Sequence, residues 1–182
     1  DPTREGRAYL DVSGWQWSFG AGLLWELVKD RVWLGASYQA QPNVSGGMKL
    51  EGTLLNRFDT ESRAKEADLT QTLPEVYRAS LRAKVTNDLE LRVFGDYIPW
   101  SVFAGQCIGA RGEKCAVQVD GSVASDGTGT LTYFRRNWMD AFGIRVSASY
   151  WTSKALEIFG GVGYDSNAVT DESLDPAYMD GN

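Results

Sequence analysis

The chain has 182 residues and a formal net charge of −6, with 20 glycines, 7 tryptophans and 8 tyrosines but no histidine. An acidic chain lacks the basic surface that nucleic-acid binding requires, so we expect no nucleic-acid partner. Without an imidazole base the common hydrolase mechanisms are excluded, and we expect no enzymatic activity. No apolar run approaches the about 18 residues of a transmembrane helix. The glycine and aromatic content favours β structure with many turns.

The first predicted strand covers residues 8–27, and its centre, "WQWSFGAGLLWEL", alternates between large apolar and small or polar residues. Side chains of a strand point alternately to its two faces, so one face of this strand is apolar. Strands of soluble proteins usually end after about five or six residues, whereas about 9–11 tilted residues cross a bilayer. The length therefore favours a membrane-crossing strand. The preceding "DPTREGRAYL" lacks the apolar core of a signal peptide, as expected of a mature or excised chain.

The same alternation recurs along the chain and predicts about six strands. They cover residues 8–27, 32–42, 73–85, 89–101, 138–151 and 156–166. Short turns join some of them, and residues 43–72, 102–137 and 167–182 are predicted as long external loops. Short turns that alternate with long loops are typical of outer-membrane barrels. Within residues 46–72 the spacing of leucines also allows a short amphipathic helix, with a solvated loop as the alternative.

These features predict an all-β fold: an antiparallel transmembrane β-barrel of the outer-membrane type, to which residues 1–182 contribute one partial β-barrel domain. About six strands are fewer than the eight of the smallest closed barrel. Missing strands or a protein partner must therefore close the sheet, because open edges cannot face lipid. A soluble lipocalin-like barrel or sandwich, acting as a lipid carrier, is the alternative interpretation.

Three stretches of the chain carry motifs in a fixed order. The first is a Gly-rich hairpin. The second is a pair of strands, one that opens with Leu-Pro and one that ends in Tyr-x-x-Trp-Ser, and the third is a Trp-x-Asp strand that leads to Gly-x-x-Tyr-Asp. These stretches are "WSFGAGLLWELVKDRVWLGASYQ", "LPEVYRASLRAKVTNDLELRVFGDYIPWS" and "RNWMDAFGIRVSASYWTSKALEIFGGVGYDSNAV". In this order the motifs resemble the FadL/TodX family of outer-membrane long-chain fatty acid transporters. The resemblance implies a bacterial outer-membrane barrel of about 14 strands with an N-terminal plug.

The resemblance also implies a function, namely passive transport of long-chain fatty acids or other hydrophobic small molecules through the barrel, with membrane lipid around it. The alternative is a FadL-like barrel that serves as a scaffold subunit of a larger outer-membrane assembly and binds a protein partner. We expect no cofactor, because "GGVGYD" lies within a strand and "SDGTGT" lacks the lysine of a phosphate loop.

The short turn "TND" sets the register of the predicted strands 73–85 and 89–101. The expected inward pairs are Lys84 with Glu90, Arg82 with Arg92, Ser80 with Phe94 and Arg78 with Asp96. Two arginines directly opposite each other require an anion, either a carboxylate of the protein or a bound one such as a fatty acid head group. The candidate ligand-binding residues of the lumen are Arg78, Arg82, Arg92, Arg145, Phe94 and Trp100. A structural ion network, or packing of the aromatic residues against a plug, is the alternative.

Cys107 and Cys115 lie in the second predicted loop, in "CIGARGEKC". Outside the cytosol such a pair predicts a disulfide, which would contribute about 2–3 kcal/mol for so short a loop. A zinc site needs three or four ligands, and the chain has no histidine. We therefore expect no metal site.

Overall fold

The computed structural model describes residues 7–58, 61–116 and 129–173, which form two compact units made mainly of strands. The described residues of the five-strand unit are 7–17, 42–58, 61–73, 102–116 and 129–137. The described residues of the six-strand unit are 18–41, 74–101 and 138–173. Within the described ranges, no helix is both long enough and apolar enough to cross a membrane.

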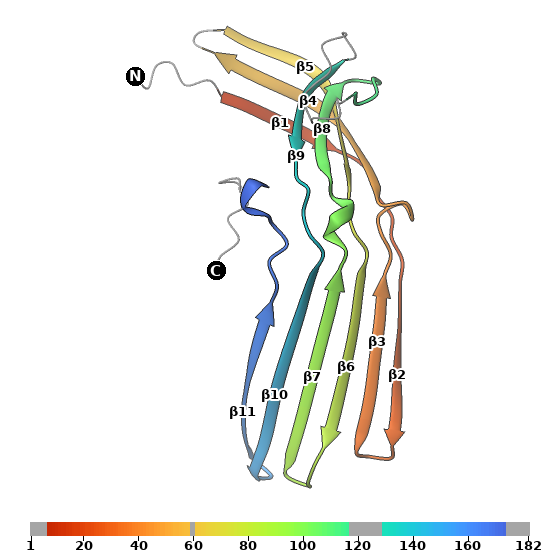
Figure 1. Ribbon diagram of the computed structural model, residues 1–182, viewed down its shortest axis with the longest axis vertical. Coiled ribbons are helices and arrows are strands. Elements are labelled where there is room, and N and C mark those ends of the chain that lie inside the picture. Colours follow the sequence, from red (N-terminus) through yellow and green to blue (C-terminus); the bar gives the residue numbers. More distant parts are fainter. Residues whose placement is uncertain (1–6, 59–60, 117–128, 174–182) are drawn as a thin grey trace, which may run out of the picture. The chain divides into compact units, whose positions relative to one another are not determined.

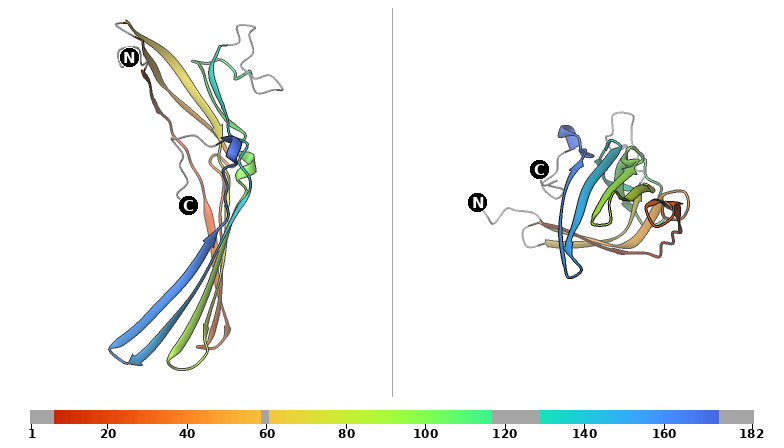
Figure 2. Two further views of the ribbon diagram at one scale, coloured as in Figure 1. Left: turned by 60° about the vertical axis from the view of Figure 1, so that its left-hand side comes forward. Right: turned by 90° about the horizontal axis from the view of Figure 1, so that it is seen from below.

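The six-strand unit is one antiparallel sheet, as the all-β prediction requires (Figure 1). Its strands are β2 (Gly20–Val28), β3 (Val32–Gln39), β6 (Val76–Lys84), β7 (Leu89–Ile98), β10 (Ala141–Ser153) and β11 (Leu156–Asp165). They lie in the order β11-β10-β7-β6-β3-β2, so strands joined by a short turn are also neighbours in the sheet. The three short turns lie at one end of this sheet, at the bottom of Figure 1 and of the left view in Figure 2. Strands β2 and β11 form its edges, so the described sheet is open.

The five-strand unit is a second antiparallel sheet with a small apolar core. Its strands, in the sheet order β1-β4-β5-β8-β9, are β1 (Arg7–Ser13), β4 (Gly47–Phe58), β5 (Glu61–Thr72), β8 (Gly105–Ala110) and β9 (Thr130–Arg135). The core consists of Leu54, Ala67 and Ile108, with Leu10, Leu69 and Leu131 packed against it. Glycine at position 52 permits the close approach of β1 to β4, because a Cβ there would overlap the carbonyl oxygen of Asp11.

The five-strand unit corrects the expectation of long loops. Residues 43–72 contain β4 and β5, and residues 102–137 contain β8 and β9. The helix considered for residues 46–72 is wrong. The misleading feature is the spacing between Leu50 and Leu54, since four residues fit the strand period of two as well as the helical period of 3.6.

Other predicted boundaries also change. The long strand 8–27 divides into β1 and β2, which belong to different sheets, and the single domain 1–182 becomes two units. Strand β7 ends at Ile98, directly before Pro99, and residues Trp100–Val102 form a short 3-10 helix. Proline has no backbone N–H to continue the ladder, which accounts for the earlier end. Of the predicted loop 167–182, residues after 173 lie outside the described part of the chain.

Candidate functional site

The six-strand sheet has one face that is apolar and exposed. Cross-strand pairing joins the middle of this apolar face into a continuous row, from Trp25 on β2 to Val162 on β11. The members of the row are Trp25, Leu34, Leu81, Val93, Val146 and Val162. All six side chains are exposed, between 37% for Val93 and 78% for Val162. An exposed apolar surface of this extent is typical of contact with a membrane or a partner.

A row of aromatic residues borders the apolar face at the end away from the short turns. Its members are Phe19, Tyr38, Tyr77, Tyr97, Phe142 and Tyr164, which come from or directly flank all six strands. Neighbouring rings are close, with centroids 5.2 Å apart for Tyr38 and Tyr77 and 6.3 Å apart for Tyr77 and Tyr97. Such rows mark the membrane–water boundary of outer-membrane barrels.

Three tyrosine hydroxyl groups of this aromatic row donate hydrogen bonds to carboxylates. Tyr38 and Tyr77 donate to Glu75, at 2.9 and 2.7 Å, and Tyr97 donates to Asp140 at 2.5 Å. Rings that are apolar on one side and hydrogen-bonded to charged groups on the other suit a boundary between hydrocarbon and water. At about 3.3 Å per residue and the about 40° tilt of strands in outer-membrane barrels, the stretch of β7 from Tyr97 to Leu89 would span about 20 Å along a membrane normal. This span is close to the height of the apolar band of such barrels, which is about 25 Å.

The opposite, polar face carries the arginines that the sequence places inward. The register of β6 and β7 is the expected one: Arg82 pairs with Arg92, and Arg78 with Asp96. The side chains of the two opposed arginines both reach Glu90, whose carboxylate oxygens lie 2.7 Å from each guanidinium. Glu90 is fully buried, whereas the arginines are about half exposed, at 49% and 45%. The anion that this arginine pair requires is thus a carboxylate of the same hairpin.

This arrangement corrects one expected contact. Glu90 faces Lys84 in the register, but its carboxylate binds Arg82 and Arg92 instead. The Lys84 ammonium lies 5.6 Å from the ring centre of Trp33, over which Arg82 also lies at 4.9 Å. Cation–π contacts of this kind replace the predicted Lys84–Glu90 ion pair.

A second ion cluster lies on β7, β10 and β11. Arg145 binds Asp96 at 2.9 Å and Asp165 at 2.8 Å. A Cβ at position 143 would lie 2.5 Å from Asp165 Oδ1 and 2.8 Å from Asp96 Oδ1, so Gly143 leaves room for both carboxylates. Phe94 lies beside this cluster, with the Arg145 guanidinium 5.8 Å from its ring centre.

The other two candidate lumen residues differ in their surroundings. Trp100 lies outside the strands, in the short 3-10 helix, and its ring stacks edge-on against Trp138 at 4.9 Å. Arg78 remains on the polar face of β6, and within the described ranges no hydrogen bond or ion pair reaches its guanidinium. The structure thus brings Arg82 with Arg92 and Arg145 with Phe94 together, and leaves Trp100 apart.

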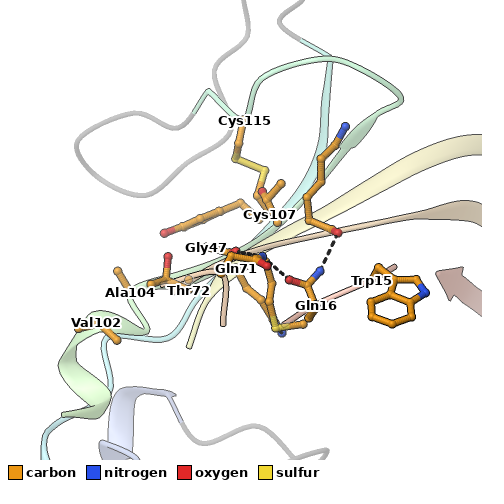
Figure 3. A pocket seen from close by; sticks show the side chains of 15 residues that line it. Trp15, Gln16, Gly47, Gln71, Thr72, Val102, Ala104, Cys107 and Cys115 are labelled. Carbon is orange, nitrogen blue, oxygen red and sulfur yellow. Dashed lines mark hydrogen bonds between the residues drawn. A yellow bond between two sulfur atoms is a disulfide. The ribbon is translucent and has the colours of Figure 1, made fainter. Parts of the chain in front are cut away.

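The five-strand unit holds an open pocket of about 620 Å³ next to a disulfide (Figure 3). The predicted bond between Cys107 and Cys115 is present and joins β8 to the segment that follows it. Figure 3 shows Trp15 and Gln16 at the pocket, where the Gln16 amide donates to the Lys49 carbonyl oxygen at 3.2 Å and accepts from Asn43. The disulfide therefore forms part of the pocket lining.

A buried carboxylate connects three segments of this unit. Asp68 on β5 is 2% exposed and lies 2.9 Å from Lys49 Nζ and 3.1 Å from Arg111 Nε. The backbone N–H of Gly112 donates to it at 2.9 Å. Burial raises the pKa of Asp68, but the Gly112 hydrogen bond and the charges of Lys49 and Arg111 outweigh it, so the net pKa is lowered. The carboxylate is therefore held in its charged form.

The lowered pKa of Asp68 predicts a loss of local stability in acid. A carboxyl whose pKa is lower in the folded chain stabilises that chain above its unfolded pKa of about 3.9, and this stabilisation is lost as the pH falls through the folded value. We expect exchange protection of β4 and β5, measured by hydrogen-exchange mass spectrometry and corrected for intrinsic rates, to fall as the pH drops below about 4. The variant Asp68→Asn should be less protected near neutral pH and should lack this acid-dependent loss. An acid-dependent loss of the same size in Asp68→Asn would contradict the assignment.

Comparison with known proteins places these features in one family. Residues 3–178 match the family model described as "Outer membrane protein transport protein (OMPP1/FadL/TodX)". The chain belongs to the OMPP1/FadL/TodX family. FadL/TodX proteins are bacterial outer-membrane proteins, and the chain is accordingly an outer-membrane protein. The predicted resemblance and location are confirmed.

Two similar proteins show how much of a family member's length this chain covers. A long-chain fatty acid transport protein of Escherichia coli O6:H1 is 26% identical over 173 residues, which are 89% of this chain and 35% of the relative. The crystal structure of a Pseudomonas aeruginosa FadL homologue matches with a TM-score of 0.68 at 17% identity, over 87% of this chain and 36% of that one. The chain thus spans about a third of the length of these relatives. The family description and the curated relative both name transport, and neither supports the scaffold alternative.

Several residues of this FadL-family site are absent from the candidates taken from the sequence. Glu90 is one acidic residue of an alternating strand and Asp68 is one of several acidic residues in a predicted loop, and nothing in the sequence shows that these two carboxylates are buried. The aromatic row could have been predicted from the sequence, because Tyr38, Tyr77 and Tyr97 lie near the ends of their strands, away from the short turns. Aligning the predicted hairpins at their turns would have revealed it.

Proposed function

We propose that the six-strand sheet is part of the wall of a closed outer-membrane barrel of about 14 strands. The exposed edges of β2 and β11 support closure, because unpaired backbone groups are not stable in lipid. The remaining strands of the longer protein, or a partner chain, would complete the ladder. In this arrangement membrane lipid covers the apolar face below the aromatic row, and the polar face lines the lumen.

The whole protein, in this proposal, carries long-chain fatty acids or similar hydrophobic molecules across the outer membrane. The observation that carries it is the pairing of an apolar, aromatic-bordered face with a polar face whose arginines are largely neutralised by buried or paired carboxylates. Contact between an acyl chain and a wall whose charges are neutralised costs less free energy than contact with a wall that carries free charges. The name of the E. coli relative, a long-chain fatty acid transport protein, supports the same substrate class.

The polar face offers apolar contact as well as charge. Leu24, Trp33, Phe94 and Phe159 point to this side, and small residues such as Gly22, Gly35 and Gly161 lie between them. We assign Arg82, Arg92 and Arg145 to holding the wall together, since each is engaged by a carboxylate. Transport would then need neither a covalent step nor a cofactor, only binding and release down a gradient.

Binding of a hydrophobic probe to the full-length protein tests this function. We expect the purified protein in detergent to retain acyl-chain lipids detectable by mass spectrometry and to bind radiolabelled palmitate saturably. The Arg145→Gln variant, which keeps a folded wall through the Arg82–Glu90–Arg92 cluster, should bind palmitate with similar affinity. Absence of both co-purified acyl chains and saturable palmitate binding in the wild-type protein would refute the proposal.

A further inference from the structure

One face of the five-strand sheet is polar and carries the pocket next to the disulfide. Cross-strand pairing places four residues of this face in one row, namely Lys49, Thr70, Cys107 and Tyr133. Their strand neighbours Leu69 and Ile108 point the other way, to the apolar core. All four residues of the row line the pocket of about 620 Å³. Small-molecule sites have volumes of about 300–1,000 Å³, so the pocket has room for a ligand.

The pocket offers no free charge to a ligand. Among the described residues that line it, Lys49 is the only charged one. Its ammonium lies 2.9 Å from Asp68 Oδ2 and 3.1 Å from Glu51 Oε1, so two carboxylates already neutralise it. An anionic ligand would have to compete with both carboxylates for this ammonium. The electrostatics of the pocket therefore favour a neutral ligand.

The polar groups of the lining also disfavour a pure hydrocarbon. The amide and hydroxyl side chains that line the pocket are Gln16, Asn43, Thr70, Gln71, Thr72 and Tyr133. A hydrocarbon packed against such groups would exclude water without giving them a partner, which costs free energy. Within the described residues, the hydroxyls of Thr70, Thr72 and Tyr133 make no hydrogen bond. The lining therefore suits a neutral molecule that is rich in hydroxyl groups.

Gln16 is held in place by its neighbours. Its Nε2 donates to the Lys49 carbonyl oxygen at 3.2 Å, and its Oε1 accepts from Asn43. Asn43 in turn donates to the Gly47 carbonyl oxygen at 2.9 Å. An amide has two N–H groups and two lone pairs, so Gln16 keeps one donor and one acceptor for a ligand. Because this amide is already fixed, little side-chain entropy is lost when a ligand binds.

The ring of Tyr133 is also fixed, because it lies over a glycine of the neighbouring strand β8. A Cβ at Gly105 would lie 2.7 Å from Tyr133 Cε2, well inside the normal distance between two carbon atoms. Glycine at this position therefore leaves the ring its place across β8. Tyr133 thus contributes a hydroxyl whose position is set before a ligand arrives.

An exposed aromatic ring lies at one end of the pocket (Figure 3). Trp15 belongs to the lining, yet it is 95% exposed. A Cβ at Gly14 would lie 2.9 Å from the Lys49 carbonyl oxygen, so glycine brings the chain close to β4 directly before this tryptophan. An indole so exposed is stabilised when a flat molecule covers it. The C–H face of a sugar ring is such a surface, and the hydroxyls around the ring reach polar groups nearby.

The chain enters and leaves the five-strand unit at one end of the six-strand sheet. The crossing points, at residues 17–18, 41–42, 73–74, 101–102 and 137–138, all lie beyond the aromatic row and away from the short turns. In outer-membrane barrels the short turns face the periplasm and the longer connections face the outside. In the proposed barrel the pocket is therefore outside the cell, within reach of free saccharides and of the sugar head groups of glycolipids.

We propose that the pocket of the five-strand unit binds a neutral saccharide. Trp15 stacks on one sugar ring, while Gln16, Thr70 and Tyr133 form hydrogen bonds with its hydroxyl groups. The saccharide is either free in the medium or the head group of a glycolipid in the outer leaflet, since both present the same chemistry. Apart from its position outside the cell, this site does not rest on the proposed transport function.

Saturation-transfer NMR on the full-length protein in phosphatidylcholine vesicles, which carry no sugar, tests this assignment. The probes are four neutral trisaccharides, namely maltotriose, mannotriose, galactotriose and chitotriose. We expect saturable transfer from the protein to at least one of them. A diacylglycerol that carries the same sugar is then added to the vesicles. Weaker binding of the trisaccharide identifies the glycolipid head group as a ligand of the pocket, whereas unchanged binding assigns the pocket to free saccharides.

Three variants test the assigned contacts. Trp15→Ala should weaken binding of the trisaccharide about tenfold, and its exposure means that the fold is kept, as circular dichroism would verify. Tyr133→Phe, which keeps the ring over Gly105 and removes only the hydroxyl, should weaken binding about threefold. The matched control Trp17→Ala removes an exposed tryptophan outside the lining and should leave binding unchanged. Palmitate binding should be the same in all three variants.

Three results would overturn the assignment. The first is the absence of saturable transfer to any of the four trisaccharides, and the second is equal affinity of Trp15→Ala and the wild-type protein. The third is displacement of the bound trisaccharide by palmitate, which would assign the pocket to the transported molecule instead. The transport function is tested separately, by palmitate binding to the wild-type protein, so the two proposals can fail independently.

Discussion

Replacing Glu90 with glutamine is expected to lower the free energy of unfolding by about 3 kcal/mol. Glu90 is fully buried and holds Arg82 and Arg92 at 2.7 Å each, while these arginines face each other across β6 and β7. Glutamine keeps the shape but leaves two opposed cations without an anion. The expected loss of stability is at the low end of the range for a broken buried ion pair. The reason is that both guanidiniums are about half exposed, so that water screens their charges.

Urea unfolding of the full-length protein in lipid vesicles measures this loss. The matched control is Glu157→Gln on β11, an exposed glutamate for which the described residues provide no ion pair. The double variant Glu90→Gln/Arg92→Gln removes one of the opposed charges and should recover part of the stability. Equal stability of Glu90→Gln and Glu157→Gln would show that Glu90 does not organise the arginines.

Placing an arginine at Val93 is expected to cost about 2–4 kcal/mol of folding free energy. Val93 lies in the middle row of the apolar face, between Leu81 and Val146 on the neighbouring strands. If lipid covers this face, the charge lies near the centre of the hydrocarbon, where its desolvation is most costly. A water-exposed sheet would tolerate the same substitution with little change.

The control for this variant is a second arginine at another depth on the same strand and face. Leu89 lies beside the short turn, and arginine there should cost only about 0–1 kcal/mol, because the side chain reaches the interface. Both variants are compared by urea unfolding in vesicles. Similar costs for Val93→Arg and Leu89→Arg would contradict a membrane whose centre lies at the middle row.

The sheet that would face the membrane was largely predictable from the sequence. Strict period-two alternation defines which side chains share a face, and a short turn such as "TND" leaves few possible registers. The pairing of Arg82 with Arg92 followed from these two facts alone and is found in the structure. The disulfide between Cys107 and Cys115 was predictable because two nearby cysteines in an exported protein have few other roles.

The partners of the charged side chains were not predictable in the same way. A register gives the residue directly opposite, but long side chains also reach diagonal neighbours. Glu90 faces Lys84, yet it binds Arg82, two residues further along β6. Asp96 faces Arg78 but binds Arg145 from β10, a strand far away in sequence. Which cation a carboxylate binds depends on the geometry of three neighbouring strands. The sequence of one hairpin does not contain this information.

The five-strand unit was missed for a different reason. Its strands β4 and β5 carry many charged residues and little continuous alternation, so they resemble solvated loops. Their pairing is stabilised by the small Leu54–Ala67–Ile108 core and by the buried Asp68 cluster. The core depends on contacts with β8 and the Asp68 cluster on the turn that follows β8, both well beyond β4 and β5 in the chain.

The central claim is that lipid covers one face of the six-strand sheet and water the other. Spin labels at Val93 and Ile144, on the apolar face, and at Ser80 and Ser147, on the polar face, test it most directly in the full-length protein reconstituted into vesicles. We predict that oxygen, which is enriched among acyl chains, relaxes the labels at Val93 and Ile144 more strongly than a water-soluble nickel chelate does, with the reverse at Ser80 and Ser147. Equal accessibility of the two faces to both reagents would contradict the account.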